Sequence, residues 1–293
     1  SLTKIKIKNG TEFFWIKSIL KMSIEITKSY RAYKKSPYKS IKHSSYFPVY
    51  DHLFCPYIGK EITFVEIGIL GGGSLFMWRE FFGQNARIIG IDLNPEAKRW
   101  EKEGFEIYIG SQSDPNFWEY FKNEVGNIDI VLDDGGHTFE QQIITIENIL
   151  PNIKDTGLIV VEDTHTSYMR EFGGPSSYSF VEYAKNVVDG INYRFGKFSK
   201  KIHEKSVYSV TFLESFVVFN INRELSSIES HPTNNGGIDL NISHGNAGTV
   251  TLQKKLPSLF KQIKKVRILR SVLANLYGKI LKTKIYKYTT NLS

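Results

Sequence analysis

Short apolar runs recur through the middle of the chain, and turn residues bound each of them. Runs of this length are typical of buried strands and are too short for most helices. The stretches between them have helical features. Because strands alternate with helices, the pattern predicts an α/β fold with a doubly wound, mostly parallel sheet. The expected strands are residues 62–67, 87–92, 105–109, 128–133 and 157–162, and the expected helices are residues 74–83, 95–102, 115–124, 139–150 and 178–189.

Two further apolar runs, residues 206–213 and 215–221, are joined at Glu214. This connection is too short for a crossover, so the two strands should be antiparallel and the sheet should end in an antiparallel strand. Asp114 followed by Pro115 is a typical helix start. Gly157 is expected in the turn before the fifth strand, where a break in regular structure is needed.

Both ends of the chain are strongly basic. Residues 1–47 hold eleven Lys/Arg and two Asp/Glu, and residues 254–293 hold eleven Lys/Arg and no acid, although the net charge of the whole chain is only +8. The middle is therefore acidic. A helix is expected over residues 12–35 and a basic amphipathic helix over residues 256–281. The expected divisions are a basic helical extension (1–59), the α/β domain (60–223), a linker or mobile loop (224–253) and a basic C-terminal helix (254–293). Residues 36–60 are expected as a loop-rich lead-in to the domain.

The basic ends permit three interpretations. They can pack on the core or on another subunit, bind anionic membrane lipid, or bind nucleic acid. No nucleic-acid reading motif accompanies the charge, so we expect no nucleic-acid partner, and we favour protein packing in a homo-oligomer over peripheral membrane contact. The single cysteine, Cys55, excludes an internal disulfide and suits a reducing compartment. No apolar run approaches the roughly 18–20 residues of a membrane span, and no signal-peptide pattern is present. We therefore expect a cytoplasmic protein, with peripheral contact to the inner face of the membrane as the alternative.

Two of the expected strands end in acids, Asp133 and Asp134 in one case and Glu162 and Asp163 in the other. In an open α/β sheet, ligands lie beyond the carboxyl ends of the strands. Crowded carboxylates require a cation or raised pKa values, and oxygen ligands favour a hard ion such as Mg²⁺. We expect Asp134, Glu162 and Asp163 to bind the metal. Asp133 either caps the following helix or contributes to cofactor binding.

His137 follows Asp134 by three residues, across two glycines. That short reach can hold an imidazole beside the metal as a general base. The alternative is an iron site made of His137, His165 and one acid, which we consider weaker. We interpret His165 as structural.

A glycine-rich turn follows the first expected strand, and Asp92 ends the second, where an acid can accept hydrogen bonds from a ribose. The dehydrogenase spacing G-x-G-x-x-G is not met, and an ordinary strand–helix turn is the alternative to a nucleoside cofactor site. Gln112, after the third strand, either contacts an adenine edge or belongs to a helix cap. The turn residues assigned to the cofactor are Glu66, Gly68, Gly72, Gly73 and Ser74.

An aromatic and glycine-rich segment follows the second acidic pair. It is either a lid over an acceptor or a surface turn. Its residues are Tyr168, Arg170, Phe172, Gly173 and Gly174.

On these residues the chain resembles the metal-dependent, S-adenosylmethionine-dependent sugar O-methyltransferases of the macrocin and mycinamicin type. The resemblance covers roughly residues 60–220, and Gly136 stands where the family is expected to have serine. The stretches that carry it are Glu66–Gly68, Gly72–Ser74, Ile91-Asp92, Asp134–His137, Glu162–Tyr168 and Phe172–Gly174.

The resemblance implies a class I methyltransferase fold, Mg²⁺ on Asp134, Glu162 and Asp163, and His137 as the base. It implies transfer of a methyl group to a hydroxyl of a sugar or glycan, such as a glycosylated natural product, a nucleotide sugar or a surface polysaccharide precursor. Two alternatives stay open. One is an O-methyltransferase of a catechol-like small molecule, and the other is a non-catalytic nucleotide-binding or membrane-recruitment module.

Overall fold

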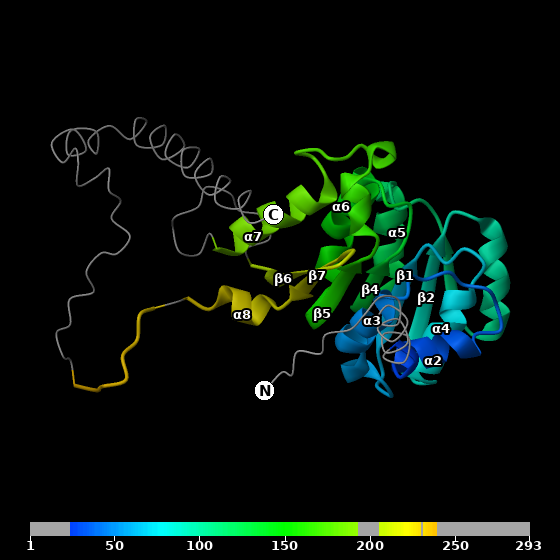
Figure 1. Ribbon diagram of the computed structural model, residues 1–293, viewed down its shortest axis with the longest axis horizontal. Helices are drawn as coiled ribbons and strands as arrows, with labels where there is room; N and C mark the ends of the chain where they lie inside the picture. The colour runs from blue at the N-terminus through cyan, green and yellow to red at the C-terminus, as the bar shows by residue number, and fades with distance from the viewer. Residues whose placement is uncertain (1–23, 193–204, 230, 239–293) are drawn as a thin grey trace, which may run out of the picture. The chain divides into compact units, whose positions relative to one another are not determined.

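The computed structural model describes residues 24–192, 205–229 and 231–238 (Figure 1). The chain divides into two compact units, residues 1–231 and 232–293. The first contains a seven-stranded sheet in the order β3-β2-β1-β4-β5-β7-β6, in which β7 runs antiparallel to both of its neighbours. This is the strand order of a class I methyltransferase fold. The strands are β1 (Thr63–Ile67), β2 (Arg87–Asp92), β3 (Glu106–Ile109), β4 (Ile128–Asp133), β5 (Ile153–Val161), β6 (Val207–Leu213) and β7 (Phe216–Ile221).

Helices cover both faces of the sheet (Figure 1). One buried cluster joins α2, α3 and α4 to one face, and a second joins α5, α6 and α7 to the other. The clusters take alternate residues of the same strands, Phe64 and Val65 for example, as the two-residue period of a strand requires. The helices are α2 (Lys28–Lys35), α3 (Tyr46–Phe54), α4 (Gly73–Phe82), α5 (Pro115–Val125), α6 (Phe139–Ile149), α7 (Phe180–Asn192) and α8 (Arg223–Ser227).

The α/β pattern expected from the sequence is confirmed, and so is the cap at Asp114, whose side chain accepts from the backbone N–H of Asn116. The placement of Gly157 in a turn is wrong. β5 begins at Ile153, so Gly157 lies inside the strand, beside a register shift between β5 and β4. A Cβ atom at Gly157 would lie 2.9 Å from the carbonyl oxygen of Asp129. The glycine therefore permits close approach of two strands.

The loop-rich lead-in expected over residues 36–60 is also wrong in part, because it contains α3 and a 3₁₀ turn, Cys55–Tyr57. Pro48 lies in the first turn of α3, where its missing N–H is not needed for an intrahelical bond. The buried residues of this helix are Tyr46, Phe47, Tyr50 and Phe54, which are spaced to share one face.

The linker expected over residues 224–253 begins instead as the short helix α8. Residues 12–23 of the expected N-terminal helix, residues 239–253 and the basic helix at 256–281 lie outside the described residues. The domain boundaries themselves stay predictions. Within the described ranges, no helix is both long and apolar enough to cross a bilayer.

Candidate active site

The two acidic pairs lie side by side at the carboxyl edge of the sheet. Asp133 on β4 is in register with Val161 on β5, so the residues that follow each strand emerge together. The structure brings Asp134, Asp163 and His137 into one group, whose ligand atoms all lie within 4.8 Å of one another. The other predicted metal ligand, Glu162, lies on the buried side of this group, with its side chain 2% exposed.

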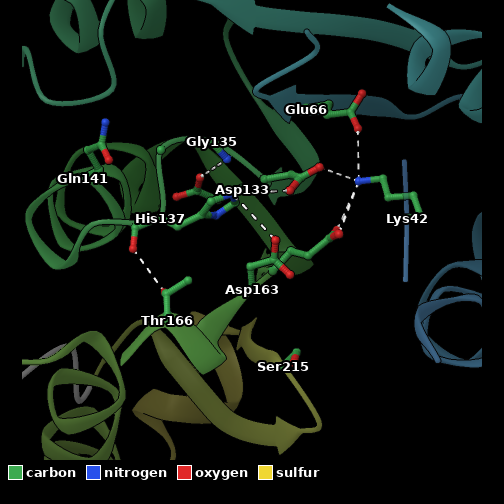
Figure 2. Close-up of polar contacts among 12 residues, drawn as sticks. Lys42, Glu66, Asp133, Gly135, His137, Gln141, Asp163, Thr166 and Ser215 are labelled. Atoms are coloured by element: carbon green, nitrogen blue, oxygen red, sulfur yellow. Dashed lines mark hydrogen bonds and ion pairs between the residues drawn. The ribbon is translucent and has the colours of Figure 1, made fainter. Parts of the chain in front are cut away.

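His137 lies between the two aspartates. Its Nε2 atom is 3.6 Å from Asp163 Oδ2 and 3.9 Å from Asp134 Oδ1. Its backbone carbonyl accepts a hydrogen bond from Thr166 (Figure 2). Among the described residues, no group hydrogen-bonds the buried Nδ1 atom. The imidazole is therefore held beside two carboxylates through its Nε2 side.

A lysine that the sequence analysis did not select reaches the same carboxylates. Figure 2 shows the ammonium of Lys42 pointing into the acidic group from a separate segment of the chain. Its Nζ atom lies 2.5 Å from Asp134 Oδ2 and 3.3 Å from both oxygens of Glu162, with Glu66 Oε1 at 3.9 Å. The side chain of Lys42 is only 2% exposed, so this charge is neutralised almost wholly by protein carboxylates.

Two tyrosines of α3 complete the contacts with the acids. The hydroxyl of Tyr50 donates to Glu162 Oε2 at 2.7 Å, and the hydroxyl of Tyr46 donates to Asp163 Oδ1. A spacing of four residues separates Lys42, Tyr46 and Tyr50 in the sequence. Their closest acidic partners are Asp134, Asp163 and Glu162, respectively. That spacing of one cation and two phenols was the signal available in the sequence, but the prolines around it suggested a loop.

Burial and charge shift the pKa values of this group in opposite directions. Burial raises the pKa of Glu162 to about 8 and that of Glu66 to about 7, although the Lys42 ammonium opposes both shifts. Burial alone would lower the pKa of Lys42, but Asp134 and Glu162 outweigh it and hold that pKa well above its ordinary value. The donor set suits a hard divalent cation, because Asp134 and Asp163 are partly exposed carboxylates facing a cavity.

The alternative iron site, made of His137, His165 and one acid, is not found among the described residues. His165 Nδ1 hydrogen-bonds Ser215 Oγ at 3.0 Å and lies 3.8 Å from Asp163. The candidate metal group within the described part of the chain contains His137 but not His165.

A cavity of about 420 Å³ opens beside His137, at the carboxyl ends of β1, β2 and β4. Gly68, Asp92 and Gln112 line it, as expected for cofactor residues. Asp92 Oδ2 accepts from the backbone N–H groups of Ile69 and Leu70 at 3.1 and 2.9 Å, so this acid also fixes the glycine-rich turn.

Gln112 is buried and its polar atoms are engaged by protein. Its Nε2 donates to Asp133 at 3.0 Å, and its Oε1 accepts from the N–H of Gly136 at 2.8 Å. The interpretation of Asp133 as a helix cap is wrong, because Thr138 caps α6. Burial raises the pKa of Asp133 to about 6, and its bonds from Gln112 and Gly135 oppose that rise. Gln112 and Asp133 thus shape the loop that carries Asp134 and His137.

The remaining predicted cofactor residues lie behind the cavity wall. Glu66 is fully buried and accepts from Ser74 Oγ at 2.7 Å and from Trp78 Nε1 at 3.1 Å. A Cβ atom at Gly73 would lie 2.5 Å from the carbonyl oxygen of Tyr38, and one at Gly72 would overlap the ring of Trp100. These residues determine the course of the turn and its contact with residues 36–45.

A second cavity, of about 480 Å³, is lined by Thr164 and His165, the two residues that follow Asp163. Aromatic and polar side chains line it, including Tyr46, His165, Tyr168 and Ser215. Of the segment expected as an acceptor lid, Tyr168 is 64% exposed at this cavity, and Arg170–Phe172 form a 3₁₀ turn after it.

Residues 65–164 match a family model described as a methyltransferase domain. The chain carries a methyltransferase domain. It is 30% identical over 204 residues to demethylmacrocin O-methyltransferase from Streptomyces fradiae, a match that covers 65% of this chain and 50% of that protein. It is 31% identical over 159 residues to 8-demethyl-8-alpha-L-rhamnosyl tetracenomycin-C 2'-O-methyltransferase from Streptomyces olivaceus, covering 51% and 42%.

The methyltransferase domain also has a solved structural relative. The MycE methyltransferase of the mycinamycin biosynthetic pathway, determined in complex with Mg, SAH and mycinamycin VI, superposes with a TM-score of 0.61 at 25% identity, covering 70% of this chain and 55% of that one. The expected resemblance to sugar O-methyltransferases is confirmed. The chain spans about half the length of the curated relatives it matches.

Proposed function

We propose that this protein is an S-adenosylmethionine-dependent, Mg²⁺-dependent O-methyltransferase acting on a hydroxyl of a sugar or glycan. The observation that carries the proposal is the group of Asp134, His137 and Asp163 in the wall of the first cavity. The next residues of the same segment, Thr164 and His165, line the second cavity. A methyl donor in the first cavity would therefore lie beside the His137 imidazole. The names of the relatives, all O-methyltransferases of glycosylated compounds, support the sugar as acceptor.

In this proposal the cofactor occupies the cavity lined by Gly68 and Asp92, and the acceptor occupies the cavity lined by His165 and Tyr168. When bound, S-adenosylmethionine supplies an activated methyl group on its sulfonium. Asp134, Asp163 and Glu162 are the proposed metal ligands; when bound, Mg²⁺ supplies a positive charge that makes a nearby hydroxyl more acidic.

His137 would take the proton of the acceptor hydroxyl at Nε2. Bound S-adenosylmethionine would supply the methyl group to that oxygen, with its S–C bond broken and S-adenosylhomocysteine leaving. Asp163 and Asp134 both lie within 4 Å of Nε2 and orient the imidazole. Glu66, Asp133 and Gln112 support the loops that carry these groups. Alignment of the reacting atoms between the two cavities supplies much of the remaining rate.

A methyl-transfer assay tests the proposal. The protein is incubated with S-adenosylmethionine and a panel of glycosylated natural products and nucleotide sugars, with catechol as the competing small diol, and S-adenosylhomocysteine is quantified. We expect turnover on a sugar-containing acceptor that is lost after exhaustive chelation and restored by MgCl₂. Turnover on catechol alone would favour the small-molecule alternative, and full activity after chelation would remove the metal from the mechanism.

The remaining partners are proposals as well. We propose that the protein forms homo-oligomers through its basic ends, with contact to anionic lipid as the alternative, and that it is cytoplasmic. The basic ends support the first proposal, and the single cysteine supports the second. This support comes from the sequence, since most of the basic residues lie outside the described ranges.

A further inference from the structure

Residues 36–45, here called the strap, link α2 to α3 and run beside both the cofactor cavity and the acidic group. Ser36 Oγ donates to the carbonyl of Gly73 at 2.7 Å, and the ring of Tyr38 lies 4.6 Å from that of Trp100. Ile41 is part of the wall of the cofactor cavity. The next residue, Lys42, turns inward to the carboxylates. The strap is therefore attached at one end to the glycine-rich turn and at the other to the proposed metal ligands.

The ammonium of Lys42 uses oxygens that a divalent cation would need. Two of the three proposed ligands, Asp134 and Glu162, have oxygens within 3.3 Å of Nζ. The side chains of Lys42 and Glu162 are each 2% exposed, and that of Asp134 is 20% exposed. Buried carboxylates gain most from a single well-placed cation, and two cations on the same oxygens repel each other strongly where solvent screening is weak.

We propose that Lys42 is an internal competitor of the divalent cation, so that metal binding displaces its ammonium and releases the strap from the acidic group. This inference rests on the proposed function, since it concerns the same metal. It makes Lys42 a positioning residue. The lysine pairs with Asp134 and Glu162 while the strap is docked. Metal loading gives these carboxylates to the ion and frees the segment that borders the cofactor cavity.

The first experiment measures Mg²⁺ affinity by calorimetry in the full-length protein and in Lys42→Met. Methionine keeps the length of the side chain and removes the charge. The matched control is Lys39→Met, an exposed lysine of the same strap whose loss changes the net charge equally. We expect Lys42→Met to bind Mg²⁺ at least about tenfold more tightly, a gain of about 1.4 kcal/mol, and Lys39→Met to match the wild type.

The second experiment uses the unmodified protein and so does not depend on the folding of a variant. Lysines are acetylated in a short pulse with acetic anhydride, with MgCl₂ or with NaCl of equal ionic strength, and modification is read by peptide mass spectrometry. Lys42 should be protected in NaCl and become modified in MgCl₂, while Lys39 is modified in both.

The outcomes separate this inference from the proposed function. Equal or weaker Mg²⁺ binding by Lys42→Met, or continued protection of Lys42 in MgCl₂ while the wild type binds the ion, overturns the competition and leaves the proposed function intact. If neither protein binds Mg²⁺, the metal requirement of the proposed function falls, and the competition falls with it.

Discussion

His137 and Asp163 both hold left-handed backbone conformations, with φ of 59° and 56°. Residues with a side chain adopt this region at a cost of roughly 1–3 kcal/mol, and such strain concentrates at functional sites. The strain here orients the imidazole toward the carboxylates. Replacing His137 with alanine should lower kcat by about 10²–10⁴-fold, because the proton acceptor is lost, while affinity for S-adenosylhomocysteine stays unchanged in calorimetry.

The control for His137→Ala is His165→Ala, at the acceptor cavity. This change should raise the KM for the acceptor and alter kcat much less. Wild-type turnover in His137→Ala would instead assign this histidine a structural role.

Glu66 gives the metal-free protein a pH-dependent stability. Burial raises its pKa from 4.5 to about 7 in the folded state. The folded state therefore holds a proton that the unfolded state has released, so this contribution is complete below about pH 4.5 and is lost as pH rises through about 7. The loss is about 3 kcal/mol. Urea denaturation in the presence of chelator measures the free energy of unfolding of the wild type and of Glu66→Gln between pH 4.5 and 8. The wild type should lose about this amount relative to the variant over that range. If both free energies change in parallel with pH, the raised pKa of Glu66 is contradicted.

Most of the acidic group could be predicted at the residue scale, because strand ends that carry acids converge at one edge of a parallel sheet. Lys42 could not. Its partner Asp134 is 92 residues away in sequence, and a lysine in a basic segment has the same local pattern whether it is solvated or buried. The roles of Gln112 and Glu66 as supports also depend on hydrogen bonds that sequence spacing does not reveal.

The helix α3 supplies a hydroxyl, that of Tyr50, to the buried acid Glu162. Replacing Tyr50 with phenylalanine leaves Glu162 Oε2 without that donor, so unfolding free energy should fall by about 1–3 kcal/mol. The matched control is Tyr57→Phe, which removes an exposed hydrogen bond from Tyr57 OH to Thr156 O and should cost about 0.5–1.5 kcal/mol. The shift of the urea unfolding midpoint, at an unchanged denaturant slope, measures the loss of unfolding free energy in each variant. Equal losses in Tyr50→Phe and Tyr57→Phe would count against a special role for Tyr50.

Elements with regular spacing were predictable, and the errors occur where a single residue gave an ambiguous signal. Pro48 suggested a break but lies in the first turn of α3, and Gly157 suggested a turn but lies inside β5. Proline is compatible with a helix start and glycine with close strand approach, so neither residue alone decides the structure.

For the whole molecule, the basic C-terminal region should serve association rather than chemistry. A truncated protein ending at residue 253 loses eleven positive charges and no negative ones. We expect it to keep its affinity for S-adenosylhomocysteine and to change its oligomeric state, solubility or binding to anionic vesicles. The amphipathic helix that the sequence predicts over residues 256–281 would need a partner for its apolar stripe.

Calorimetry, light scattering and vesicle sedimentation measure these properties of the truncated protein. If assembly and lipid binding are unchanged and methyl transfer is lost, the C-terminal region belongs to the acceptor site.

The contacts of Lys42, Tyr46 and Tyr50 with acids 92 to 117 residues later have a consequence for synthesis of the protein. A ribosome adding about 5–20 residues per second needs roughly 6–23 s to make the partners of the two tyrosines after the tyrosines themselves have emerged. During that interval α3 has no acids to bind and no completed sheet to cover. The aromatic face of the nascent helix is thus exposed to chaperones for seconds, and the acidic group cannot be complete until residue 163 has been made.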